Sequence, residues 1–207
     1  MGSLKYLIGR EETGFTNFDD PEDIMEEITF RIKNPYSEDL LNYNCIYNQL
    51  KLNSEERSIE VFAERTERIN YILHKLPIFS LCKFQTDNPN AENVLDETNF
   101  IILTYDVKEN VDQLKSELVK ETGAFFCSAN IIRSGIIAVY WIRESIKNHF
   151  DYMKYFDLFA QHMFNKNRSL PANFNTPISC HPVPFDKNII INPDAARLKT
   201  SRIINRN

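Results

Sequence analysis

Apolar residues recur at helical spacing in two stretches of the N-terminal half. In residues 19–33 the repeat is Ile24, Ile28 and Ile32, with Asp20 as N-cap and Pro21 at the first helical position. These features together predict an amphipathic helix. Residues 54–76 predict a second helix that ends before a proline. Its apolar side is expected to hold Ile59, Phe62, Ile69, Tyr71 and Leu73.

Strand-like runs dominate from residue 78 onward. Short strands are expected at residues 4–9, 78–85 and 188–192, and a hairpin is expected from residues 124–131 and 135–142. The run NFIILTYDVK (99–108) is continuously apolar, which indicates a strand buried on both faces. Helices are expected at residues 111–122, ended by Gly123, and at 144–164. Residues 37–52 fit either a helix or a strand.

This order of elements predicts an α+β fold in which helices cover one face of a largely antiparallel sheet. No internal repeat and no domain boundary is evident, so we expect a single domain spanning residues 1–207. Within it we distinguish a helical N-terminal region (1–60), a core (61–195) and a basic tail (196–207).

Charge is distributed unevenly along the chain. The formal net charge is −5 and the pI is near 5.5, which argues against strong non-specific binding to nucleic acid. Residues 11–60 carry 13 acids and four bases. The tail instead carries Arg197, Lys199, Arg202 and Arg206 and no acid. Such a tail is typical of a solvated terminus, and its alternative uses are a phosphate contact or a linker.

The four cysteines lie far apart, with no CxxC pair. Cys82 and Cys127 fall in apolar runs, where a free cysteine behaves as a small hydrophobe. We therefore expect no disulfide framework or structural zinc site, and we expect a reducing cytoplasm as the compartment. No apolar stretch reaches membrane-spanning length, so no membrane partner is expected.

Catalytic motifs are sparse. The chain has five glycines and neither a Walker pattern nor GxGxxG. What remains is Asp106, at the end of the most apolar strand. Two-metal nucleotidyl transfer needs two carboxylates at i and i+2 on one strand face. Here the i position holds Thr104, so Asp106 is either half of a catalytic site or the polar end of a buried strand.

The order of several motifs resembles the VirE N-terminal domain family. That family is a divergent branch of the archaeo-eukaryotic primase-polymerase superfamily, found with mobile elements. The similar segments are HKLPIFSLCKF (74–84), NFIILTYDV (99–107), FFCSANIIRSGIIAVYWI (125–142), NHFDYMKYFDLF (148–159) and FDKNIIINPDA (185–195). The resemblance implies a primase-like fold with an RRM-like core sheet flanked by helices, and a role in DNA replication.

The same comparison implies that the metal site has degenerated. The first metal carboxylate of the family falls on Thr104 and the second is retained as Asp106. A late family acid persists as Asp186, while the family's SPSG turn has become Ser128-Ala129-Asn130. Loss of one metal ligand is expected to cost orders of magnitude in rate.

Our leading hypothesis is a catalytically degenerate primase-like domain. It would bind a nucleotide, single-stranded nucleic acid or a protein partner in the cleft that corresponds to the active site of the family. Asp106 and Asp186 are the candidate metal ligands, for Mg²⁺ or Mn²⁺ if activity survives. The candidates for binding nucleotide or nucleic acid are Ser128, Arg133, Ser134 and Lys187, and Tyr140 or Trp141 are candidates for stacking on bases.

Two alternatives remain open. The first is an active nucleotidyl transferase whose missing acid is supplied by Asp186, Asp194 or Glu109. The second is a structural or partner-binding protein whose acidic N-terminal helices form the interface.

Overall fold

The computed structural model of the chain describes residues 5–10, 14–84, 98–106, 110–130, 135–167 and 181–195. Side chains at a few positions within these ranges, Asp106 among them, are not described. The fold is α+β, as the sequence predicted, and its strands form two antiparallel sheets of four strands each.

The first sheet joins the N-terminal strands to the middle of the chain. Its order is β2-β1-β3-β7, and every neighbouring pair is antiparallel. The strands are β1 (Lys5–Arg10), β2 (Gly14–Phe18), β3 (Ile78–Phe84) and β7 (His181–Pro182).

The second sheet contains the expected buried strand and the expected hairpin. Its order is β4-β6-β5-β8, again antiparallel throughout. The strands are β4 (Thr98–Asp106), β5 (Phe126–Asn130), β6 (Gly135–Ile146) and β8 (Ile190–Ile191). Leu103 and Thr104, which point to opposite faces of β4, are both buried, so burial on both faces of this strand is confirmed.

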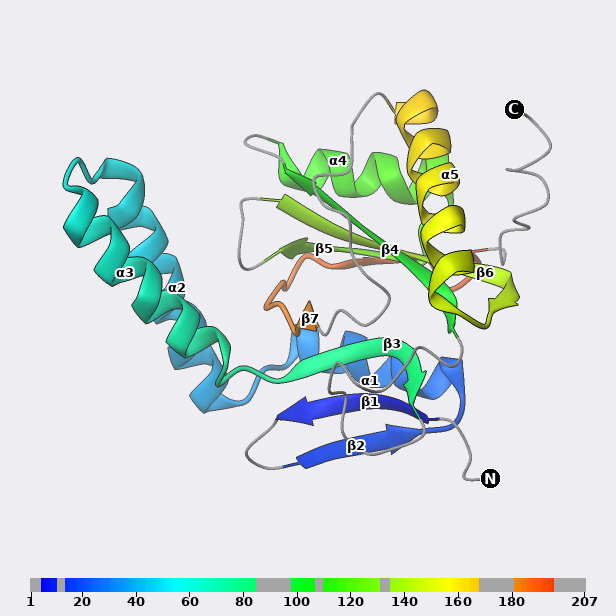
Figure 1. Cartoon of the computed structure of the whole chain (residues 1–207), viewed down its shortest axis with the longest axis horizontal. Coiled ribbons are helices and arrows are strands. Elements are labelled where there is room, and N and C mark those ends of the chain that lie inside the picture. Colours follow the sequence, from blue (N-terminus) through cyan, green and yellow to red (C-terminus); the bar gives the residue numbers. More distant parts are fainter. Residues whose placement is uncertain are drawn as a thin grey trace.

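Helices cover both faces of the second sheet. One face packs against α4 (Val111–Glu117), the π-helical turn η1 (Leu118–Thr122) and α5 (His149–Asn167). The other face packs against α1 (Pro21–Lys33) and the first sheet. Figure 1 shows the resulting order, with α4 and α5 above the β4–β6 sheet and β1–β3 below it. The sequence predicted one core sheet with helices on one face, and the structure differs in both respects. The difference arises because strand pairing and helix placement depend on contacts between residues that are distant in the sequence.

Helix α1 begins as its sequence predicts. The Asp20 side chain caps it by accepting a hydrogen bond from the Glu22 N–H at 3.4 Å, and Pro21 is the first helical residue. Ile24, Ile28 and Ile32 are fully buried in the core between the two sheets. The three isoleucines therefore attach α1 to the body of the protein.

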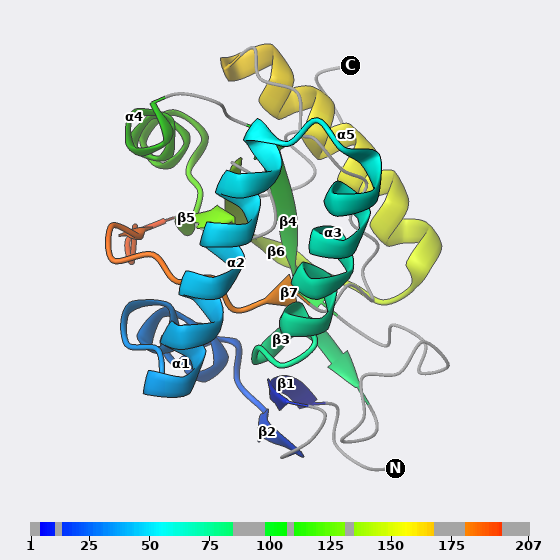
Figure 2. The same ribbon diagram turned by 90° about the vertical axis from the view of Figure 1, so that its left-hand side faces the viewer.

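Helices α2 (Ser37–Glu55) and α3 (Ile59–Leu73) form an antiparallel hairpin that extends away from both sheets (Figure 1), with the two helices side by side (Figure 2). This assigns the ambiguous residues 37–52 to a helix. The hairpin has a small core of its own, made of Tyr43, Ile46, Ile69, Ile72 and Leu76. It is joined to the body by an ion pair between Asp39 and Arg10 of β1, and by a hydrogen bond from the Tyr43 hydroxyl to the Val183 carbonyl.

Two details of the helix predictions were wrong. Ile59, Phe62 and Tyr71 were expected on the buried side of α3, but 86%, 49% and 64% of their surfaces are exposed, because α3 packs against α2 and does not lie along a sheet. Residues 144–146, expected at the start of a helix, instead continue strand β6, which pairs with β4 as far as Ile146.

Candidate functional site

The end of β4 lies beside the β5–β6 hairpin. Thr104 pairs with Ile137 of β6, and Ile137 also pairs with Ser128 of β5. The backbone of Asp106 pairs with Gly135. The side chain of Asp106, and Arg133 and Ser134 in the hairpin loop, lie outside the described part of the chain. The predictions for these three side chains therefore stay predictions.

Thr104 and Ser128 are both buried, with exposed fractions of 6% and 0%. The Ser128 hydroxyl donates to the Ala129 carbonyl at 3.2 Å. The Thr104 hydroxyl has no hydrogen-bond partner among the described residues. A buried neutral hydroxyl thus occupies the position where the family resemblance places the first metal carboxylate.

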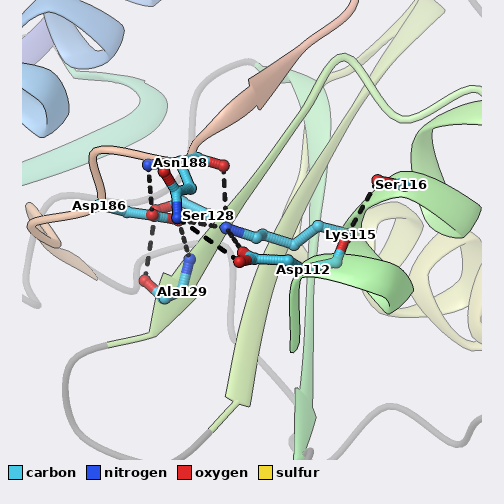
Figure 3. A network of polar contacts seen from close by, with 7 residues as sticks. All are labelled: Asp112, Lys115, Ser116, Ser128, Ala129, Asp186 and Asn188. Atoms are coloured by element: carbon cyan, nitrogen blue, oxygen red, sulfur yellow. Dashed lines mark hydrogen bonds and ion pairs between the residues drawn. The ribbon is translucent and has the colours of Figure 1, made fainter. Parts of the chain in front are cut away.

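Asp186, the second acid proposed for the metal site, lies in the segment between β7 and β8 and is nearly buried. Its Oδ2 accepts hydrogen bonds from Lys115 Nζ at 2.9 Å and from the Ala129 backbone N–H at 2.7 Å. Its Oδ1 accepts from the Asn188 backbone N–H at 2.9 Å. Figure 3 shows the network around this carboxylate. Both oxygens are therefore used by contacts within the protein.

Lys115 is the centre of this network (Figure 3) and is only 1% exposed. Its ammonium group donates to Asp186 Oδ2 at 2.9 Å, to the Asn188 carbonyl at 2.9 Å and to Asp112 Oδ1 at 2.7 Å. An ammonium has three N–H donors, so all three are satisfied. The hydrogen bond and charge of Lys115 lower the pKa of the largely exposed Asp112 carboxyl. The arrangement ties α4 to β5 and the 186–188 segment, with no donor left for a substrate.

Asp186 is bonded to the sheet on the other side of β6 from the backbone of Asp106. It contacts Ala129 of β5, and β6 lies between β5 and β4. Two strand spacings amount to about 10 Å, whereas paired catalytic metal ions lie about 4 Å apart and share their ligands. Its bond to Lys115 and this position both count against Asp186 as a metal ligand, and the prediction of a shared site with the Asp106 side chain stays a prediction. Among the described residues, no group of three or more His, Cys, Asp or Glu side chains is arranged to hold a metal ion.

The remaining candidates take no part in the contacts of this network that are described above. Lys187 is exposed and its Nζ lies 5.8 Å from the centroid of the Phe185 ring. Tyr140 is fully buried and packs edge-on against Phe159 with a centroid separation of 4.8 Å. Tyr140 is therefore a core residue and does not present its ring to a base.

Trp141 is mostly buried, but it lines a groove of about 440 Å³ between α1 and the second sheet. Its ring packs against Phe100 at 5.5 Å and Phe125 at 5.7 Å. The α1 side of the groove carries the exposed residues Glu22 and Glu26. Two carboxylates beside the aromatic wall repel phosphates, so this groove does not suit nucleic acid.

Lys115 and Asp112 were not identified from the sequence. One signal for Lys115 was present, because it lies one turn after Val111 and one turn before Leu118 and Val119 on the apolar side of α4. A lysine within an apolar stripe indicates either a snorkelling side chain or a buried ion pair. Its buried acidic partner, Asp186, was not identifiable because it lies 71 residues away.

Cys82 and Cys127 are buried in strands β3 and β5, in agreement with the small hydrophobic role that their apolar runs predicted. Burial raises the pKa of the Cys127 thiol well above its ordinary value, which makes it a poor nucleophile. Burial also lowers the pKa of His181 to about 4. Both groups therefore remain neutral near pH 7.

Within the described ranges, no helix combines the length and the apolar character needed to cross a membrane. No protein-family model matches the chain, and comparisons with curated proteins and with solved structures give no significant match.

Proposed function

We propose that this chain is a catalytically inactive, primase-like domain that works by binding a protein partner. The observation that supports the proposal most strongly is that the Asp186 carboxylate is already bonded within the protein. Its carboxylate is held by Lys115 and two backbone N–H groups and lies across β6 from strand β4. A metal ion at Asp186 would have to displace a buried ammonium group, which would then lose its charge partner.

The replacement at residue 104 supports the same conclusion. Two-metal catalysis requires ligands that neutralise both the attacking and the leaving oxygen. Thr104 offers only a neutral hydroxyl, and that hydroxyl is buried. Asp106 by itself is not sufficient to hold the two metal ions that this catalysis requires.

A protein is a better partner than nucleic acid for two reasons. The first is the net charge of −5, together with the acidic side of the Trp141 groove. The second is the α2–α3 hairpin. Of the ten large apolar side chains that are exposed in the described residues, seven lie on these two helices. They are Leu40, Leu41, Tyr47, Leu52, Ile59, Phe62 and Tyr71. Concentrated apolar exposure on one projecting element is typical of a protein-binding surface.

The test of inactivity is a nucleotide-incorporation assay. Purified chain is incubated with Mn²⁺ or Mg²⁺, labelled nucleoside triphosphates and single-stranded templates with and without a primer. We expect no product above that of the Asp106→Ala variant. Metal-dependent product that Asp106→Ala abolishes would contradict the proposal and would favour the active nucleotidyl transferase.

A further inference from the structure

The groove beside Trp141 has two chemically different walls. Helix α1 supplies Glu22 and Glu26, which are four residues apart and therefore lie on the same face of the helix, with Met25 buried beside them. The groove thus presents two exposed carboxylates one helical turn apart.

The opposite wall is apolar. It is formed by Phe125, Trp141 and Ile191, from the region where β5, β6 and β8 lie side by side. A volume of about 440 Å³ is within the range of specific binding sites. An occupant that suits both walls combines basic groups with apolar side chains.

Residues 196–207 have this composition. The segment reads ARLKTSRIINRN, with four basic residues, no acid, and three large apolar residues, Leu198, Ile203 and Ile204. Its place in the chain also fits, because Ala195 itself lines the groove and its backbone N–H is bonded to the Asn192 carbonyl at 3.0 Å. The segment is therefore attached to the chain at the groove.

Ala195, Glu22 and Glu26 line the same groove, so the reach of the segment is counted from within it. Four residues beyond Ala195, Lys199 can extend to about 14 Å at roughly 3.5 Å per residue. Covalent attachment through a short connection also gives a local concentration in the millimolar range, so that weak contacts are enough for occupancy.

We propose that residues 196–207 bind in the groove between α1 and the second sheet, with their basic groups on Glu22 and Glu26 and their apolar side chains on the Trp141 wall. This gives the uneven charge of the sequence a role, since the basic tail is matched to part of the acidic N-terminal region. The inference is independent of whether the domain is catalytic.

The direct test is zero-length cross-linking of the full chain with a carbodiimide, which joins an amine to a carboxylate that it touches. Lys199 is the only lysine in residues 196–207. We expect a Lys199 cross-link to Glu22 or Glu26 in the monomeric species, identified by peptide mass mapping. In an Arg197→Gln/Arg202→Gln/Arg206→Gln variant, which keeps Lys199, its yield should fall about tenfold because the ion pairs that hold the segment are lost.

A matched control removes the same number of positive charges elsewhere. Arg68, Lys120 and Lys154 are exposed on α3, η1 and α5, and their combined replacement by glutamine should leave the cross-link at the wild-type yield. Trp141 supplies a second readout because it is the only tryptophan in the chain. Its quenching by acrylamide should increase in the tail variant and not in the control.

Three results would overturn the inference. One is a Lys199 cross-link found only in covalent dimers, which would mean that the groove takes the segment of a second copy. Another is equal yield in the tail variant and the control. The third is absence of the cross-link together with identical Trp141 quenching in all three proteins.

Discussion

Lys115 of α4 and Asp186, 71 residues apart in the sequence, form an ion pair with an Nζ–Oδ2 distance of 2.9 Å and exposed fractions of 1% and 8%. The pair connects a helix on one side of the second sheet to the segment that leads into β8, and through Ala129 to β5. The last acid that the family resemblance retains is thereby part of the framework of the fold.

Removing one partner of this pair should destabilise the protein strongly. Lys115→Met leaves the Asp186 carboxylate buried without its cation, and we expect the free energy of unfolding to fall by about 3–5 kcal/mol. The double variant Lys115→Met/Asp186→Asn should recover part of the loss, because no buried charge remains unpaired. Denaturant unfolding measures the free energy of unfolding of the single and the double variant. Lys120→Met, at an exposed lysine five residues later, is the matched control. A Lys115→Met cost as small as that of the control would mean that the pair contributes nothing.

Two threonines of β4 should respond oppositely to the same substitution. Thr98 is fully buried, and its Oγ1 donates to the Leu81 carbonyl at 2.6 Å and accepts from the Phe100 N–H at 3.0 Å. Thr98→Val should cost about 1–3 kcal/mol, because it leaves buried backbone groups without their partner. Thr104→Val removes a hydroxyl that has no described partner, and it should raise stability by about 1 kcal/mol. Thermal unfolding of the two variants tests this, and a loss of stability in Thr104→Val would show that the hydroxyl is satisfied.

His181 should make stability depend on pH below neutrality. Burial lowers its pKa from 6.5 to about 4. Between these values the unfolded chain binds a proton that the folded state does not, so the free energy of unfolding falls as the pH drops from about 6.5 to 4. The loss from this group approaches about 3 kcal/mol. In His181→Gln this part of the pH dependence should disappear.

The measurement is denaturant unfolding at pH 7 and pH 4 for wild type, His181→Gln and His74→Gln, the last at an exposed histidine. His74→Gln should keep the wild-type loss. Identical pH profiles for wild type and His181→Gln would contradict the assignment.

Two isoleucines of α3 should differ in how much they contribute to stability. Ile72 is 7% exposed and belongs to the hairpin core, so Ile72→Ala should cost about 2–4 kcal/mol. Ile59 is 86% exposed, and Ile59→Ala should change stability by less than about 0.5 kcal/mol. Thermal unfolding compares them, and a large loss in Ile59→Ala would mean that this residue packs within the chain.

Local patterns predicted most elements of this fold. The repeat of Ile24, Ile28 and Ile32 correctly identified α1, and the apolar run before Asp106 correctly identified β4, because helix and strand periods are properties of neighbouring residues. The division of the strands into two sheets was not predicted. It depends on pairs such as Leu7 with Ser80, which are far apart in sequence.

The candidate site was predictable only in part. Thr104 and Ser128 do lie close together in the sheet register, on either side of Ile137. The role of Asp186 was not predictable, because its partner Lys115 is brought next to it only when α4 packs against β5 and the 186–188 segment. The exposure of Ile59 was missed for a related reason, because an apolar side chain on a helix does not reveal whether another element covers it.

The central claim is that no metal–nucleotide site survives beside β4. The most direct measurement is thermal unfolding of wild type and Asp106→Ala with Mn²⁺, with nucleoside triphosphate, and with both. A ligand that binds the folded state raises the melting temperature by mass action. We predict that neither component, alone or together, moves the wild-type transition. A rise that requires both components and is lost in Asp106→Ala would contradict the account.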